Sequence, residues 1–197
     1  MSNLYNYLPD GKTQTGFSHE IHFQKTSGNF NFNLSQERTD DQFNSNDMGY
    51  FTNNNFINHY LWMGYHWNKP KNWYNRINLN FNNNLSFLAK KIEPLNETYQ
   101  SANFNVNANV QSKKLWFLGA FAGYSFAQND FYEPRTMGWF FKRGAAVNIE
   151  SWFESNDSKK YSYSIDVFTK SSIHFYNAFS MNMQFAQSMR FNNKLSV

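Results

Sequence analysis

The sequence of 197 residues has no Cys, few charged residues and no long apolar run. Without Cys, a disulfide-linked scaffold is impossible. The longest apolar runs, such as Leu115–Tyr124, are far shorter than the roughly 20 residues that a membrane-spanning helix needs. Charged residues make up only 16% of the chain and aromatic residues 20%, the reverse of a disordered composition. We therefore expect a folded chain without disulfides and without a membrane helix.

Basic residues are too scattered to suggest a nucleic-acid partner. The net charge is +4, and no Lys/Arg run exceeds two residues. Nucleic-acid binding favours a basic stripe with stacking aromatics, so no such partner is expected. The N-terminal stretch 1–15 has neither a basic region nor an apolar segment and does not resemble a signal peptide. We expect either a protein that is not exported or a piece of a longer chain.

The chain is rich in Asn and aromatic residues, and its apolar and polar residues alternate with a two-residue period. It holds about thirty Asn residues, a type that ordinary strands contain rarely. Successive side chains of a strand point to opposite faces, so alternation predicts strands with one apolar face and one wet, uncharged face. The clearest alternating runs are 30–35, 77–82, 103–110, 161–167 and 179–185.

The alternation and the turn signals predict about nine strands and the start of another. They are expected at roughly 17–25, 29–37, 56–67, 73–88, 99–110, 115–127, 139–153, 161–170, 175–190 and from 194 onward. Connections are expected to alternate in length, with a looser one around 171–174. Lys gathers beside the short turns and acidic residues beside the long loops, although Lys90, Lys91 and Arg135 also lie on the long-loop side. Short turns alternating with long loops are typical of up-and-down membrane barrels.

Strand 115–127 departs from the pattern, because both of its faces are apolar or small. Gly119 and Gly123 lie on the same face, and glycine within a strand permits a bend or the close approach of another group. The glycines of this strand would therefore permit a bend or a close approach from inside the barrel.

These features predict an all-β fold: an antiparallel up-and-down transmembrane β-barrel in a bacterial outer membrane, in contact with its lipid. With about nine to ten strands and a chain that stops mid-pattern, it is expected to be a partial barrel. Residues 1–197 would form a segment of one barrel domain, with no second domain. The alternative is a soluble β-sandwich or barrel, which also alternates but usually carries Lys, Glu and Thr on its wet face.

Motifs for catalysis, metals or cofactors are weak. No Ser/His/Asp arrangement, phosphate-binding glycine loop or Walker motif occurs, and no cofactor is expected. The His pairs 19/22 and 59/66 have opposite parity, so their side chains diverge and no metal site is predicted. The loop with Asp40, Asp41, Asn44, Asn46 and Asp47 is compatible with Ca²⁺ ligation, and equally with a solvated loop and a tight turn.

Two long loops hold the candidate ligand-binding residues. A carboxylate pair in the later loop suits glycoside hydrolysis, while an Arg–carboxylate contact that stabilises the loop is the competing interpretation. Aromatic and amide side chains in the earlier loop suit sugar binding, and equally a loop packed on itself at the barrel mouth. The candidates are Asp130, Glu133 and Arg135 in the later loop and Tyr50, Asn53 and Asn54 in the earlier one.

The later loop also carries a resemblance to a known family. Residues 129–135, followed by Gly138, Phe140 and Phe141, resemble the signature of the outer-membrane barrel family called domain of unknown function 5916, typical of Bacteroidota. The segments 46–51 and 152–160 resemble it too, and the similarity covers about Gly28 to Val197. Trp139 departs from it, since the family pattern has a basic residue there.

This resemblance implies little chemistry for the chain. Members similar to it usually carry a signal peptide and a module like family-9 carbohydrate-binding domains before the barrel. They are often labelled hydrolases, a label that would derive from that module. No catalytic residues are carried over, so no catalytic site is expected in residues 1–197.

Three functional hypotheses remain open. The first is an outer-membrane barrel segment that forms a polar pore or platform, linked to glycan binding or uptake. The second is a carbohydrate-binding or glycan-hydrolysing protein that acts through its extracellular loops. The third is a soluble β-sheet domain that serves only protein interaction.

Overall fold

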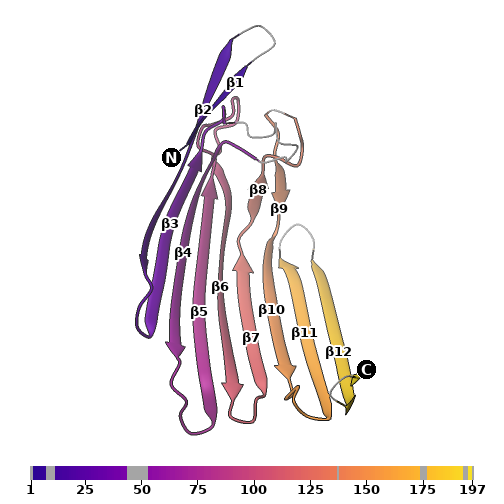
Figure 1. Ribbon diagram of the computed structural model, residues 1–197. Coiled ribbons are helices and arrows are strands. Elements are labelled where there is room, and N and C mark those ends of the chain that lie inside the picture. Colours follow the sequence, from indigo (N-terminus) through magenta and orange to yellow (C-terminus); the bar gives the residue numbers. More distant parts are fainter. Residues whose placement is uncertain are drawn as a thin grey trace.

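The computed structural model describes residues 2–7, 12–43, 53–136, 138–173, 177–192 and 195–196, which form strands and connections without a helix (Figure 1). No helix in this part of the chain is long and apolar enough to cross a membrane. The strands are β1 Ser2–Tyr7, β2 Thr13–Lys25, β3 Phe30–Thr39, β4 Phe56–Trp67, β5 Tyr74–Phe87, β6 Tyr99–Ser112, β7 Phe117–Ser125, β8 Gln128–Asp130, β9 Phe141–Arg143, β10 Ala145–Glu154, β11 Tyr161–Ile173, β12 Ala178–Asn192 and β13 Leu195–Ser196.

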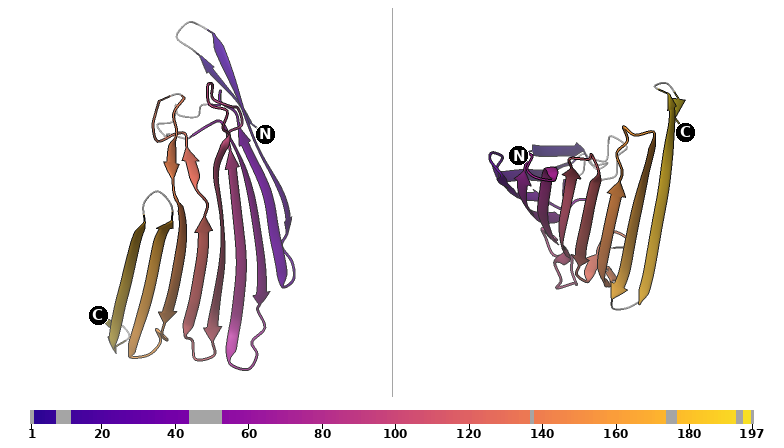
Figure 2. Two further views of the ribbon diagram at one scale, coloured as in Figure 1. Left: turned by 180° about the vertical axis from the view of Figure 1, so that it is seen from behind. Right: turned by 90° about the horizontal axis from the view of Figure 1, so that it is seen from below.

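Eleven of these strands form one antiparallel sheet in the order β1-β2-β3-β4-β5-β6-β7-β10-β11-β12-β13. Each strand pairs with its neighbour in the chain, except that β8 and β9 form a separate two-stranded hairpin between β7 and β10. The sheet is a single curved layer, as the view from below shows (Figure 2). The predicted all-β, antiparallel, up-and-down topology is confirmed. The sheet is open, because β1 and β13 lie at opposite edges of the order.

The predicted strands agree closely in the middle of the sheet and less well at its ends. β4 has the predicted bounds 56–67, and β5 differs from them by one residue at each end. The predicted strand 139–153 is divided, because residues 141–143 pair with β8 and only Ala145–Glu154 joins the large sheet. The looser connection expected around 171–174 is wrong: Ser171 and Ser172 continue β11 and pair with β12.

The connections lie at two ends of the sheet, here called the turn edge and the loop edge. At the turn edge, turns 26–29, 68–73, 113–116 and 155–160 join successive strands. The described parts of the long connections 40–55, 88–98 and 126–144 lie at the loop edge, and the last of them contains the β8–β9 hairpin (Figure 1).

Strand register gathers the alternating residues into two different faces. One row reads Phe81, Val106 and Ala122 across β5, β6 and β7, while the adjacent row reads Asn80, Asn107 and Phe121 on the other face. Within the described residues, no second layer covers the apolar face: Phe23 is 67% exposed, Met183 64% and Ile149 53%. Buried hydrophobic side chains in the described part of the chain are few, and all lie at the loop edge: Leu88, Phe131, Ala145 and Ala146.

Candidate functional site

The three long loops are hydrogen-bonded to one another at the loop edge. Asn55, buried and at a positive φ of 59°, joins the first two. Its side chain donates to the Lys90 carbonyl (3.0 Å) and accepts the Lys90 N–H (2.7 Å), and its own carbonyl accepts the Ala89 N–H (3.2 Å). Asn tolerates this left-handed backbone better than most residues. One residue therefore provides both the backbone turn and the connection between the two loops.

Tyr132 connects the third loop to the first loop and to the start of β6. Its hydroxyl donates to the Asn54 carbonyl (2.8 Å) and accepts a hydrogen bond from the side chain of Gln100 (3.3 Å). Burial raises the pKa of this hydroxyl; the negative charge of Asp130 also raises it, while the bond from Gln100 lowers it. Asn129 adds a bond from its side chain to the Tyr99 carbonyl (3.0 Å). The loops therefore form one platform with fixed side chains.

Asp130 is the charged centre of the third loop. Its Oδ1 accepts the N–H groups of Tyr132 and Glu133 (both 3.0 Å), and its Oδ2 pairs with the Arg143 guanidinium at 2.7 Å. Partial burial acts to raise the pKa of Asp130, but these N–H groups and Arg143 outweigh it and hold the pKa below its ordinary value. Such a carboxyl stays ionised near neutral pH, which disfavours a role as a general acid.

The predicted contact between Arg135 and a carboxylate in its loop is wrong. Within the described residues, the Arg135 side chain forms no ion pair, and Arg143 from β9 takes the place beside Asp130. Arg135 has a positive φ of 52°, and its N–H donates to the Tyr132 carbonyl (3.1 Å). Pairing of β9 with β8 places Arg143 opposite Gln128, two residues before Asp130, so residues far apart in the sequence come into contact.

The platform surrounds a hollow of about 340 Å³, here called the loop hollow. Four of the predicted ligand-binding residues line it: Asn53, Asp130, Glu133 and Arg135. Asn54 lies beside it and donates its side-chain N–H to the Asp41 and Phe43 carbonyls, at 3.2 and 3.0 Å. Tyr50 lies outside the described residues. The other lining residues were not predicted from the sequence; they are Gln100, Ser101, Gln128, Asn129 and Tyr132.

Asp40 organises the first loop by hydrogen bonding to the backbone. Its Oδ1 accepts the N–H groups of Gln42 and Phe43 (3.1 and 2.8 Å), and its Oδ2 accepts the Phe17 N–H (2.9 Å). Asp41 pairs with Lys90 at 2.6 Å. In the described part of the loop these contacts match a turn; 44–52 lies outside it. No cluster of three or more His, Asp or Glu able to hold a metal occurs among the described residues.

The polar face of the sheet carries a row of paired amides, here called the amide ladder. Each rung joins an Asn of β5 to the Asn opposite on β6. An amide side chain has two donor hydrogens and an oxygen with two lone pairs, so each rung keeps capacity for water or a hydroxyl group. The rungs are Asn78–Asn109 (2.8 Å), Asn80–Asn107 (2.9 Å), Asn82–Asn105 (2.8 Å) and Asn84–Asn103 (3.3 Å).

Side chains of β4 extend the ladder on one side. The Tyr60 hydroxyl donates to Asn82 (2.9 Å), and Nδ1 of His66 is hydrogen-bonded to Oδ1 of Asn78 (2.8 Å). On the other side, the ladder meets the glycines of β7. A Cβ at Gly119 would lie 2.0 Å from the Trp152 ring, so that ring lies directly over the glycine. A close approach, one of the two features that the sequence permits at the glycines, is thus present at Gly119.

The lowered pKa of Asp130 predicts that the stability of its loop depends on pH. Because its folded pKa is lowered, its stabilising effect is present above the unfolded pKa of about 3.9 and is lost as pH falls through the folded value. Hydrogen exchange of residues 128–143, corrected for intrinsic rates, should accelerate below about pH 4. Asp130→Asn should exchange faster at pH 7 and show a smaller acid response. An identical acid response in both proteins would contradict this assignment.

The fold and its loop platform define an all-β protein built on one antiparallel sheet. The model of the family described as Domain of unknown function (DUF5916) matches residues 1–197, so the chain belongs to this family. The predicted membership of this family is thereby confirmed, while the outer-membrane location and the Bacteroidota origin stay predictions. No curated protein and no solved structure matches the chain.

Proposed function

We propose that this chain is a segment of an outer-membrane β-barrel whose apolar face contacts lipid and whose polar face lines an aqueous lumen. The observation that carries the proposal is a wide single-layer sheet with an uncovered apolar face. Monomeric soluble proteins rarely expose contiguous apolar patches beyond a few hundred Å². A soluble sandwich would need a second layer over this face, and the described residues provide none.

The distribution of aromatic residues along the strands supports the same assignment. From β5 to β11, aromatic side chains lie near both ends of the apolar face, and mainly aliphatic residues and Ala lie between them, with Phe81 as an exception. Barrels with an aromatic girdle at each membrane interface show a similar distribution. Toward the turn edge these residues are Trp73, Trp116, Phe153 and Tyr163; toward the loop edge they are Phe104, Tyr124 and Phe126.

The unpaired outermost strands explain why we propose a segment of a barrel and not a whole barrel. β12 pairs with β13 only through Arg190 and Asn192, so most of its outer edge is unpaired within the described residues. Hydrocarbon offers no hydrogen-bond partner to such an edge, and membrane β-structure therefore closes into a ring. We infer that additional strands complete the ring.

The polar face suggests what the lumen admits. The amide ladder is uncharged along four rungs, and its side chains both donate and accept hydrogen bonds. Such a surface suits water and neutral hydroxylated solutes such as glycans. The loop hollow, lined by amides, a Tyr and charged side chains, would be a first contact for such a solute at the barrel mouth. Neither surface requires a reaction, so the proposal is a pore or binding platform.

Cysteine scanning tests this proposal sharply, because residues 1–197 contain no Cys and any Cys elsewhere in the full-length protein can be replaced beforehand. Val106, Asn107 and Ala108 are consecutive on β6 and alternate between the two faces. In the full-length protein in proteoliposomes, Asn107→Cys should react with a water-soluble maleimide at least about tenfold faster than Val106→Cys or Ala108→Cys, because thiols in hydrocarbon lack water. Equal labelling at the three positions would refute the membrane assignment.

A further inference from the structure

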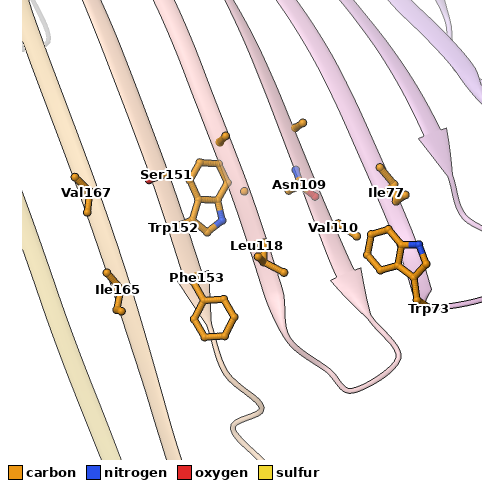
Figure 3. Close-up of a pocket in the computed structure, with 13 residues that line it drawn as sticks. Trp73, Ile77, Asn109, Val110, Leu118, Ser151, Trp152, Phe153, Ile165 and Val167 are labelled. Carbon is orange, nitrogen blue, oxygen red and sulfur yellow. The ribbon is translucent and has the colours of Figure 1, made fainter.

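The apolar face contains a second hollow, of about 590 Å³, near the turn edge; it is here called the turn-edge hollow (Figure 3). Its floor is a row of small residues in register: Ala108 pairs with Ala120, and Ala120 pairs with Ser151. The next row toward the turn edge consists of larger residues and forms its wall. That row reads Ile77, Val110, Leu118, Phe153 and Ile165. Ligand pockets commonly have volumes of about 300–1,000 Å³.

Aromatic rings connect this hollow to the turns. Phe153, a lining residue, packs against Trp116 and Tyr163 with ring centroids 6.0 and 5.5 Å apart. Trp73 lines the hollow too, and its carbonyl accepts the N–H of Lys113 (2.8 Å). The wall of the hollow is therefore joined directly to the backbone of turn 113–116.

The turns next to the hollow are strongly basic. Turns 68–73, 113–116 and 155–160 hold six lysines against one acidic residue, Asp157. None of these ammonium groups pairs with a carboxylate among the described residues, and all six side chains are exposed. Lys114 lies with its Nζ 5.4 Å from the centre of the Trp116 ring. The six are Lys69, Lys71, Lys113, Lys114, Lys159 and Lys160.

An uncovered apolar hollow beside lysines without a carboxylate partner is complementary to a molecule with a hydrocarbon chain and an anionic head. We propose that the turn-edge hollow binds an anionic phospholipid, with one acyl chain over the Ala108–Ala120–Ser151 floor and the phosphate beside Lys114, Lys113 and Lys71. Juxtamembrane clusters of Lys attract anionic lipid headgroups. Because the floor residues are small, they leave room for the acyl chain that larger side chains would occupy. This proposal rests on the membrane orientation proposed above and adds a specific lipid to it.

The proposal can be tested by measuring which lipids the full-length protein retains in detergent. The protein is mixed with equal amounts of phosphatidylglycerol and phosphatidylcholine, and the lipid that remains bound is counted by native mass spectrometry. The wild type should retain phosphatidylglycerol at least about tenfold over phosphatidylcholine. Lys71→Gln/Lys113→Gln/Lys114→Gln should abolish that preference. The matched control, Lys90→Gln/Lys91→Gln at the loop edge, should keep it.

A second variant tests the hollow itself. Ala120→Leu/Ser151→Leu fills the floor with apolar atoms and changes no charge, so it should reduce phosphatidylglycerol retention at least about fivefold while leaving a heat-modifiable gel shift intact. Unchanged retention in this variant, or in the triple Lys variant, would overturn the proposal. A wild-type protein that needs no detergent and shows no gel shift would instead refute the membrane assignment, so the two failures are distinguishable.

Discussion

An Arg in place of Val106 should strongly destabilise the full-length protein in membranes. Val106 lies mid-strand on β6, is 42% exposed on the apolar face, and pairs with Phe81 and Ala122 on its two sides. If this face contacts lipid, the guanidinium would lie near the bilayer centre, where Arg on a barrel exterior costs about 2–4 kcal/mol. Urea titration in phospholipid vesicles, read by the heat-modifiable gel shift, measures this loss.

The neighbouring residue provides the matched control. Asn107→Arg places the same charge one position along β6 but on the polar face, next to the amide ladder. Loss of the rung to Asn80 should cost about 1 kcal/mol, well below the effect at Val106. If both variants lost stability equally, the two faces would not differ in environment, and the division into a lipid face and a lumen face would fail.

The layout of the sheet was predictable because alternation is a local signal. The run around Asn103–Val110 specifies which residues share a face without any knowledge of the neighbouring strand. Register could not be predicted, because nothing in β5 or β6 alone shows that Asn80 faces Asn107 and not the residue two positions away. The amide ladder is a result of that register. β1 was missed, because its alternation is too short to distinguish from a loop.

The loop hollow was predictable only in part, and for a similar reason. Asp130, Glu133 and Arg135 are close in the chain, so composition alone indicated a cluster. Gln100 and Ser101 reach the hollow from the start of β6, where polar residues look like any other wet strand positions. Arg143 was missed as the partner of Asp130 because the β8–β9 hairpin brings it there over thirteen positions. Contacts made through pairing between segments leave no signal in composition.

A Cβ at Gly119 should destabilise the sheet substantially. The ideal Cβ position lies 2.0 and 2.1 Å from two atoms of the Trp152 ring, far inside contact distance. Gly119 is directly opposite Trp152 in the β7–β10 register, so the ring cannot avoid the new methyl group without leaving its position. Overpacking of this kind costs about 1–3 kcal/mol, and Gly119→Ala should lower the urea midpoint of the gel-shift transition accordingly.

Two comparisons separate the ring clash from a general effect of replacing glycine. At Gly123, on the same strand and face, an added Cβ would meet the far end of the Phe121 ring at 2.9 Å, so Gly123→Ala should cost clearly less. In Gly119→Ala/Trp152→Ala the clash is gone, and the double variant should be less destabilised than the sum of the two single changes. Additive losses would mean that the ring and the glycine act independently. Trp152 also lines a hollow on the polar face together with Glu150 and Asp166, so a shift of its ring would change the lining of that hollow.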